Sequence, residues 1–215
     1  MKQFGNKEYR LKIAVDARAF GNCPSGVGVY AYDFVKELAL KADFKIELLT
    51  DVACSSQISS LRKTGIPVHC YGLPVFRSGE VYRYFKFMRH FLTCQQPDLF
   101  WEPNNLLPFS LKGYKGKVAV TIHDLFPITE QEYFSWFYRL YFYFGMHGSI
   151  KWANMLLFAS KETEKQVKKF FSEMWKKEGH LTYPIVRKPP VRARHDGGFF
   201  CILEIWSEER ELIFY

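Results

Sequence analysis

The stretch from Gly21 to Gly28 contains the first residues whose types and spacing could support chemistry. It follows a short apolar run that ends at Asp16 and precedes apolar residues at helical spacing, which predicts a strand, a turn and a helix. Glycines let the backbone approach a ligand closely, and a helix N-terminus offers N–H groups to an anion. The spacing of Gly21, Gly26 and Gly28 matches neither the GxGxxG dinucleotide fingerprint nor a P-loop. Two interpretations remain open: a phosphate-facing site, or only a tight strand-to-helix turn.

A second candidate is the pair His123 and Asp124, which lies with Ile122 at the exit of the strand predicted over 117–121. A histidine at the exit of a strand can donate a hydrogen bond to a hydroxyl, act as an acid or base, or satisfy a buried carbonyl. The pair alone leaves all three roles open. Adjacent side chains point apart, so a hydrogen-bonded His–Asp dyad is not expected here.

The sequence predicts no metal site. Its remaining histidines have no ligand spacing, and its 5 cysteines are odd in number and contain no CxxC pair. We therefore expect neither structural zinc nor a disulfide framework, and interpret the cysteines as ordinary thiols.

Alternating strands and helices must position these candidate residues. Apolar runs predict strands over 12–16, 45–50, 67–71, 98–101, 117–121 and 154–159, and periodicity predicts helices over 27–42, 55–63, 81–94, 130–152 and from 161 onward. This alternation predicts an α/β fold with a doubly wound, mainly parallel sheet. Ligands bind at the carboxyl ends of such strands, where the loops over 21–28, 102–108 and 122–127 would converge.

Composition narrows the class of protein. A hydrophobic content of 48% is ample for a core, and no apolar run is long enough for a spanning helix. The N-terminus is charged and polar and lacks the apolar core of a signal peptide, so we expect a cytoplasmic protein. The net charge of +8 indicates an acidic partner. No nucleic-acid-binding motif accompanies the lysines between 161 and 177, so nucleic acid is not the expected partner.

The helix predicted over 81–94 allows two interpretations. It has an aromatic and apolar stripe with basic flanks, which suits a helix packed on a sheet with a wet, basic edge. The same pattern also suits a helix on an anionic membrane surface.

The pattern of strands and helices ends near residue 175. The segment RKPPVRARHDGG reads as a linker, and FFCILEIW is one further apolar run. We predict one domain over 1–175, followed by a degenerate linker over 176–215 that begins a missing second domain.

Three segments together resemble a known family. They are DARAFGNCPSGVGVYAYDFVKELA, DLFWEPNNLLPF, and KVAVTIHDLFPITEQEYFSWFYRLYFYF with the following ANMLLFASKETEKQVKKFF. In order and spacing they are similar to the N-terminal domain of glycosyltransferase family 4, closest to its mannosyltransferase-like branch. The resemblance implies one Rossmann-like, three-layer half of a GT-B fold, in retaining enzymes that use nucleotide-sugar donors.

The resemblance also implies roles for individual residues. His123 would be the catalytic residue that reaches toward the transferred sugar, and Asp124 would shape its loop. Ser160 would cap a helix at the cleft. The remaining substrate-binding positions would be Gly26 and Gly28 near donor phosphates or acceptor, and Asn104 and Asn105 as acceptor contacts.

The donor-binding second domain of the family is not recognised in this sequence. We therefore expect an acceptor-side half that is inactive alone and binds a nucleotide sugar only with a second domain. No metal or cofactor is expected. One alternative is a non-catalytic basic module that docks on an anionic membrane, at the inner face, or on a partner protein. Another is a remnant with no function of its own.

Overall fold

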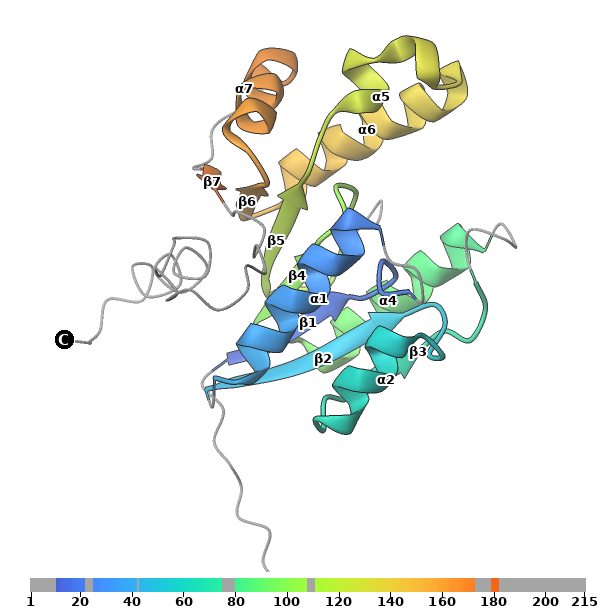
Figure 1. Cartoon of the computed structure of the whole chain (residues 1–215), viewed down its shortest axis with the longest axis vertical. Helices are drawn as coiled ribbons and strands as arrows, with labels where there is room; N and C mark the ends of the chain where they lie inside the picture. Colours follow the sequence, from blue (N-terminus) through green and yellow to red (C-terminus); the bar gives the residue numbers. More distant parts are fainter. Residues whose placement is uncertain are drawn as a thin grey trace, which may run out of the picture. The chain divides into compact units, whose positions relative to one another are not determined.

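The computed structural model describes residues 11–21, 25–41, 43–74, 80–107 and 111–172, and the backbone of 179–181 (Figure 1). Contacts divide the chain into two compact units. The first comprises Met1–Pro103 and Ser110–Lys117, and the second Asn104–Phe109 and Val118–Tyr215.

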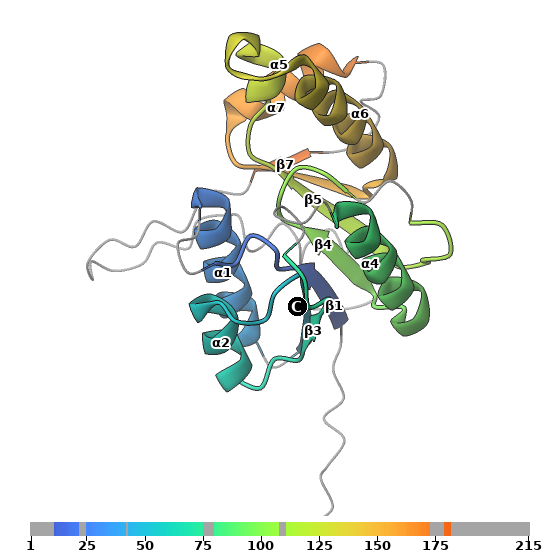
Figure 2. The same cartoon turned by 90° about the vertical axis from the view of Figure 1, so that its right-hand side faces the viewer.

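The first unit contains parallel strands in the order β3-β2-β1-β4. They are β1 (Leu11–Asp16), β2 (Phe44–Thr50), β3 (Val68–Cys70) and β4 (Leu99–Glu102). Their connections contain α1 (Gly26–Ala39), α2 (Ser56–Lys63) and α4 (Val81–Gln95). Figure 2 shows α1 and α2 on one face of these strands and α4 on the other, which is doubly wound packing.

Aromatic packing fixes α1 against the strands of the first unit. Tyr30, Phe34 and Leu38 recur at helical spacing and are buried. The Phe34 ring lies 4.8 Å from the ring of Trp101, which is itself buried in β4. The helix begins where Ser25 accepts a hydrogen bond from the Gly28 N–H, which satisfies one N–H of the first turn.

The apolar stripe of α4 is part of the core. Tyr84, Met88 and Leu92 are fully buried, whereas Arg83 and Lys86 on the same helix are exposed. This burial confirms the prediction of a helix packed on a sheet with a basic outer edge. The buried side chains of this stripe are therefore not available to a membrane surface.

The second unit contains parallel strands in the order β5-β6-β7. They are β5 (Lys117–Ile122), β6 (Met155–Phe158) and β7 (Gly179–Leu181). Between them lie α5 (Phe126–Thr129), the 3₁₀ helix η1 (Gln131–Tyr133), α6 (Trp136–Trp152) and α7 (Lys161–Phe170). The buried side of α6, including Phe142, Met146 and Ile150, contributes to the core of this unit.

One predicted element is wrong in its bounds. The helix expected over 130–152 is observed as η1 followed by α6, which begins at Trp136. Phe134 has extended backbone angles, and the Ser135 hydroxyl accepts a hydrogen bond from Tyr138 N–H. A new N-cap therefore starts the helix after a break.

Every strand pairing described within either unit is parallel, and the fold is α/β and Rossmann-like, as predicted. No helix in the described part of the chain is both long and apolar enough to cross a membrane. The domain bounds 1–175 and 176–215 stay a prediction. Of the second range, the structure describes only Gly179–Leu181, and the remainder lies outside the described residues.

Candidate functional site

His123 lies at the carboxyl end of β5, and hydrogen bonds hold its backbone at both polar groups. Its N–H donates to the Asn105 side-chain oxygen over 2.8 Å. Its carbonyl oxygen accepts from the Thr163 hydroxyl, also over 2.8 Å. The side chain is half-buried. Two segments distant in sequence therefore fix the backbone of a histidine that stays accessible at the edge of the strands. We call this arrangement the His123 clamp.

Asn105 forms one side of the His123 clamp. Its backbone has a φ of 58°, in the left-handed region where asparagine is among the most tolerated side chains. In this conformation its N–H donates to the Thr121 carbonyl at 3.0 Å while its side chain reaches His123. Asn105 thus turns the chain and anchors the end of β5. Its neighbour Asn104 is exposed.

A buried hydroxyl anchors the segment that carries Asn105. Ser149 on α6 accepts from Leu107 N–H at 2.8 Å and donates to the Gly145 carbonyl at 2.9 Å. A Cβ added at Gly145 would lie 3.0 Å from the Leu106 side chain, so the glycine permits this close packing.

The first turn of α7 forms the other side of the His123 clamp. The Ser160 hydroxyl oxygen accepts from Thr163 N–H at 3.0 Å, which makes Ser160 the N-cap as predicted. The two hydroxyl oxygens lie 2.9 Å apart. The Thr163 hydroxyl already donates its hydrogen bond to the His123 carbonyl oxygen. The Ser160 hydroxyl is therefore the donor between the two hydroxyls. The positive end of the α7 dipole consequently lies beside the His123 backbone.

Asp124 forms a local hydrogen bond in its loop. Its side-chain oxygen accepts from Phe126 N–H at 3.1 Å, where α5 begins. Burial, together with the charge of Asp124, raises the pKa of the Tyr138 hydroxyl.

Gly26 and Gly28 belong to the first unit. Gly28 is buried at the start of α1, while Gly26 is exposed and an added Cβ would meet nothing within 4 Å. Packing against the described residues thus gives no steric reason for glycine at position 26. The structure links Asn105, His123 and Ser160 through the His123 clamp within the second unit, with Asp124 next in sequence. Residues 22–24 of the glycine-rich turn lie outside the described residues.

The sequence analysis missed a buried charged cluster at the carboxyl ends of β1 and β4. Arg18 contacts Asp16 at 2.5 Å and Glu102 at 3.5 Å, and the Tyr84 hydroxyl donates to Asp16 at 3.0 Å. Burial alone would lower the pKa of the Arg18 guanidinium, but the two carboxylates outweigh it and raise that pKa. The signal in the sequence that could have revealed this cluster is that β1 and β4 each end in an acidic residue, Asp16 and Glu102. Their closeness to Arg18 and Tyr84 depends on the fold.

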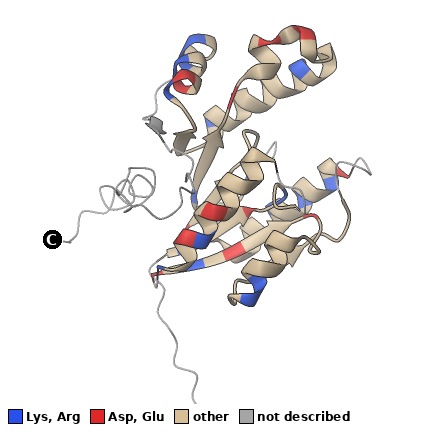
Figure 3. Ribbon diagram, in the orientation of Figure 1, with Lys and Arg blue, Asp and Glu red and all other residues tan. Residues whose placement is uncertain are grey.

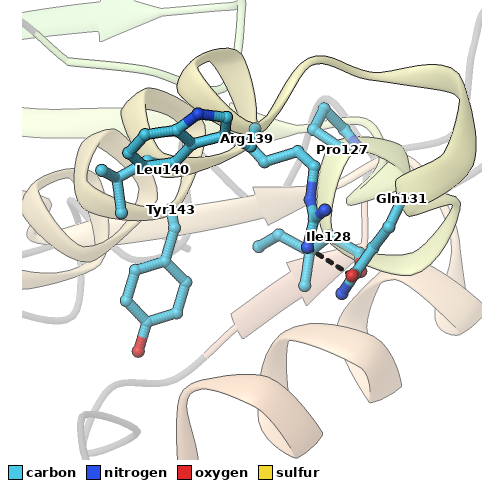
Figure 4. A pocket seen from close by; sticks show the side chains of 7 residues that line it. Pro127, Ile128, Gln131, Arg139, Leu140 and Tyr143 are labelled. Atoms are coloured by element: carbon cyan, nitrogen blue, oxygen red, sulfur yellow. Dashed lines mark hydrogen bonds between the residues drawn. The ribbon is translucent and has the colours of Figure 1, made fainter.

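A shallow hollow of about 260 Å³ lies between α5, η1 and α6 (Figure 4). Apolar side chains form most of its wall, and the Arg139 guanidinium donates to the Gln131 side-chain oxygen. None of the predicted site residues lines this hollow. Among the described residues, no group of three or more His, Cys, Asp or Glu side chains is arranged to hold a metal ion.

Comparisons with known proteins identify the fold. No family model and no curated protein matches the sequence. Among solved structures, HepE of Anabaena in complex with UDP and glucose matches with a TM-score of 0.52 and 15% identity. The match covers 81% of this chain and 44% of the HepE chain, so this chain spans less than half of that protein.

Two weaker likenesses are to the lipopolysaccharide outer core galactosyltransferase WaaB and to an alpha-glucosyltransferase in complex with UDP and DNA. Their TM-scores are 0.49 and 0.48, with identities of 11% and 13%. The likeness to HepE establishes that this chain has the α/β, Rossmann-like fold of about half of that longer protein.

Proposed function

We propose that the chain is the acceptor-side domain of a retaining glycosyltransferase, which moves a sugar from a nucleotide-sugar donor to a glycan or lipid-linked acceptor. Mannose is the sugar that the sequence resemblance favours. The observation that supports this proposal best is the His123 clamp, on a fold shared with about half of HepE, whose structure contains UDP and glucose.

In the proposed reaction, the bond between the anomeric carbon and the donor phosphate breaks. A new bond forms from that carbon to an acceptor oxygen, whose proton passes to the departing phosphate oxygen. A group that hydrogen-bonds the sugar must be held still to favour the transition state, because electrostatic stabilisation depends on preorganised donors. The His123 clamp fixes the backbone that carries the His123 side chain. His123 would contact the transferred sugar, and Asn104 would contact the acceptor.

The donor diphosphate would be bound mainly by a second domain, with Gly26 and Gly28 facing it from this chain. Charge on the leaving diphosphate would then be stabilised by backbone N–H groups and side chains, with no metal ion required. The chain alone should accordingly show no sugar transfer.

The direct test measures the binding of acceptor oligosaccharides to the full chain by saturation-transfer NMR. We expect saturation transfer to a mannose-containing oligosaccharide and its loss in His123→Ala. His147→Ala is the matched control, because this exposed histidine lies on α6 and takes no part in the His123 clamp. Equal saturation transfer by His123→Ala and the unaltered chain would contradict the role of His123. Radiolabelled sugar transfer by the purified chain alone would contradict the need for a second domain.

A further inference from the structure

A thiol and an imidazole contact each other on the exposed side of α4, in the first unit. The Cys94 Sγ lies 3.7 Å from His90 Nδ1 and 3.8 Å from His90 Nε2. Both residues are exposed, and the thiol is free of any disulfide. The His123 clamp involves neither of them. We call these two side chains the Cys94–His90 pair.

The periodicity of the helix brings the two side chains together. Residues four apart in an α-helix lie on the same face, one above the other. Tyr84, Met88 and Leu92 bury the opposite face of α4 in the core, which leaves positions 90 and 94 at the surface. A packed helix, and not a loop, therefore sets the distance between sulfur and nitrogen.

The two donor types and their separation suit one soft metal ion. Thiolate sulfur and imidazole nitrogen are the ligands that zinc most often has in proteins. A tetrahedral zinc ion, with bonds of about 2.3 Å to sulfur and about 2.0 Å to nitrogen, holds these two donors about 3.5 Å apart. The 3.7 Å between Cys94 Sγ and His90 Nδ1 is close to that separation. The two histidines of the H-E-x-x-H zinc motif have the same spacing of four residues on a helix.

The location of the pair on α4 also favours a cation. Cys94 lies in the last turn of the helix, which ends at Gln95. The carbonyl groups at a helix C-terminus give that end a partial negative charge. A positive ion bound between the two side chains would lie close to this charge.

The charges on α4 restrict the kind of cation. The helix carries Arg83, Lys86 and Arg89 and no acidic residue (Figure 3). The Arg89 side chain donates to the Lys112 carbonyl oxygen over 3.3 Å, which directs it toward a neighbouring segment. Hard ions such as Mg²⁺ bind mainly through carboxylate oxygens, which this helix lacks. A soft ion gains its affinity from the bond to sulfur, so basic neighbours oppose it less.

The number of protein ligands determines how the ion would be bound. Within the described part of the chain, no group of three or more His, Cys, Asp or Glu side chains is arranged around one ion. Structural zinc sites have four protein ligands, whereas here water would fill the remaining positions. Binding should therefore be reversible and should not be required for folding.

We propose that the Cys94–His90 pair binds a soft, thiophilic metal ion such as Zn²⁺ in an exchangeable site. On binding, one metal–sulfur bond and one metal–nitrogen bond replace two metal–water bonds, and the thiol proton passes to solvent. This inference does not depend on the proposed sugar transfer, which requires no metal ion.

The experiment is a titration of the full chain with Zn²⁺, followed by two-dimensional NMR. We expect saturable shifts of the His90 imidazole and of the amides in the last turn of α4, and no such shifts with Mg²⁺. Competition with a chromophoric chelator measures the affinity. His90→Ala and Cys94→Ser should each weaken it at least about tenfold, because the second ligand of a chelate binds at a high effective concentration. Both side chains are exposed, so both variants should keep their fold, which circular dichroism checks.

The matched controls are Cys54→Ser and His147→Ala, which remove another exposed thiol and another exposed histidine. Both should bind Zn²⁺ at α4 like the unaltered chain. Cys94→His retains two ligands four residues apart, so it should keep Zn²⁺ binding and lose affinity for the softer Cd²⁺. Absence of saturable shifts in the last turn of α4 would overturn the inference. Unchanged Zn²⁺ affinity in His90→Ala would overturn it too, because the thiol alone would then explain the binding.

Discussion

At the scale of single residues, Asn105 meets two structural requirements that few residue types meet together. Its backbone adopts a positive φ, and its side-chain oxygen accepts a hydrogen bond from the His123 N–H. Asn105→Ala should cost about 2 kcal/mol of unfolding free energy, with roughly half from strain at positive φ and half from the lost hydrogen bond. Asn105→Gly should cost less, because glycine adopts this φ without strain. Urea unfolding of both variants measures the difference, and equal losses would contradict the assigned strain.

Substitutions at Thr163 test whether the His123 clamp matters for the proposed oligosaccharide binding as well as for folding. Thr163→Val keeps the shape and removes the hydroxyl that reaches His123, so it should cost about 1–2 kcal/mol of unfolding free energy. It should also weaken oligosaccharide binding, since His123 loses one of its anchors. Thr163→Ser retains the hydroxyl and should retain binding. Calorimetric titration of both variants checks this, and unchanged affinity in Thr163→Val would argue for a purely structural hydroxyl.

Arg18 on the first unit places its guanidinium against two buried carboxylates, those of Asp16 and Glu102. Arg18→Met removes this cation, which should cost about 3–5 kcal/mol of unfolding free energy. Arg18→Lys retains a positive charge and should cost less. Urea unfolding of both variants measures the difference, and equal losses would mean that lost packing, instead of lost charge, explains them.

At the scale of elements, α6 contains two glycines with opposite environments. An added Cβ at Gly148 meets nothing within 4 Å, whereas at Gly145 it meets Leu106 at 3.0 Å. Gly148→Ala should therefore stabilise the protein by roughly 0.5–1 kcal/mol, since alanine is the better helix former. Gly145→Val should destabilise it by pressing on the segment before Leu107. Thermal unfolding of the two variants gives the comparison, and equal signs would contradict the assigned packing.

The strands and helices were largely predictable because their signals are local. The apolar run of β1 and the spacing of Tyr30, Phe34 and Leu38 need no tertiary information. The break before α6 was missed because the aromatic run on either side of Ser135 hides its capping role. The candidate site was predictable only in part. His123, Asn105 and Ser160 are recognisable by motif, but Thr163 and Arg18 act through hydrogen bonds and ion pairs that only the folded chain creates.

At the scale of the whole molecule, the chain spans 44% of HepE, and we propose that the donor site needs a second domain. Nucleotide sugars alone should then raise the melting temperature by less than about 1 °C, because a ligand stabilises only the state that it binds. Differential scanning calorimetry with UDP- and GDP-linked sugars tests this. A saturable increase would contradict the proposed division of the site.

The His123 clamp has a consequence for directed evolution of this chain. Since the backbone of His123 is held by side chains from positions 105 and 163, substitutions at the three positions should be epistatic. A library that randomises His123 alone would sample replacements on a backbone suited to histidine. Joint randomisation of the three positions would let the loop re-form around a new side chain, and is the route by which the proposed sugar site should change its specificity.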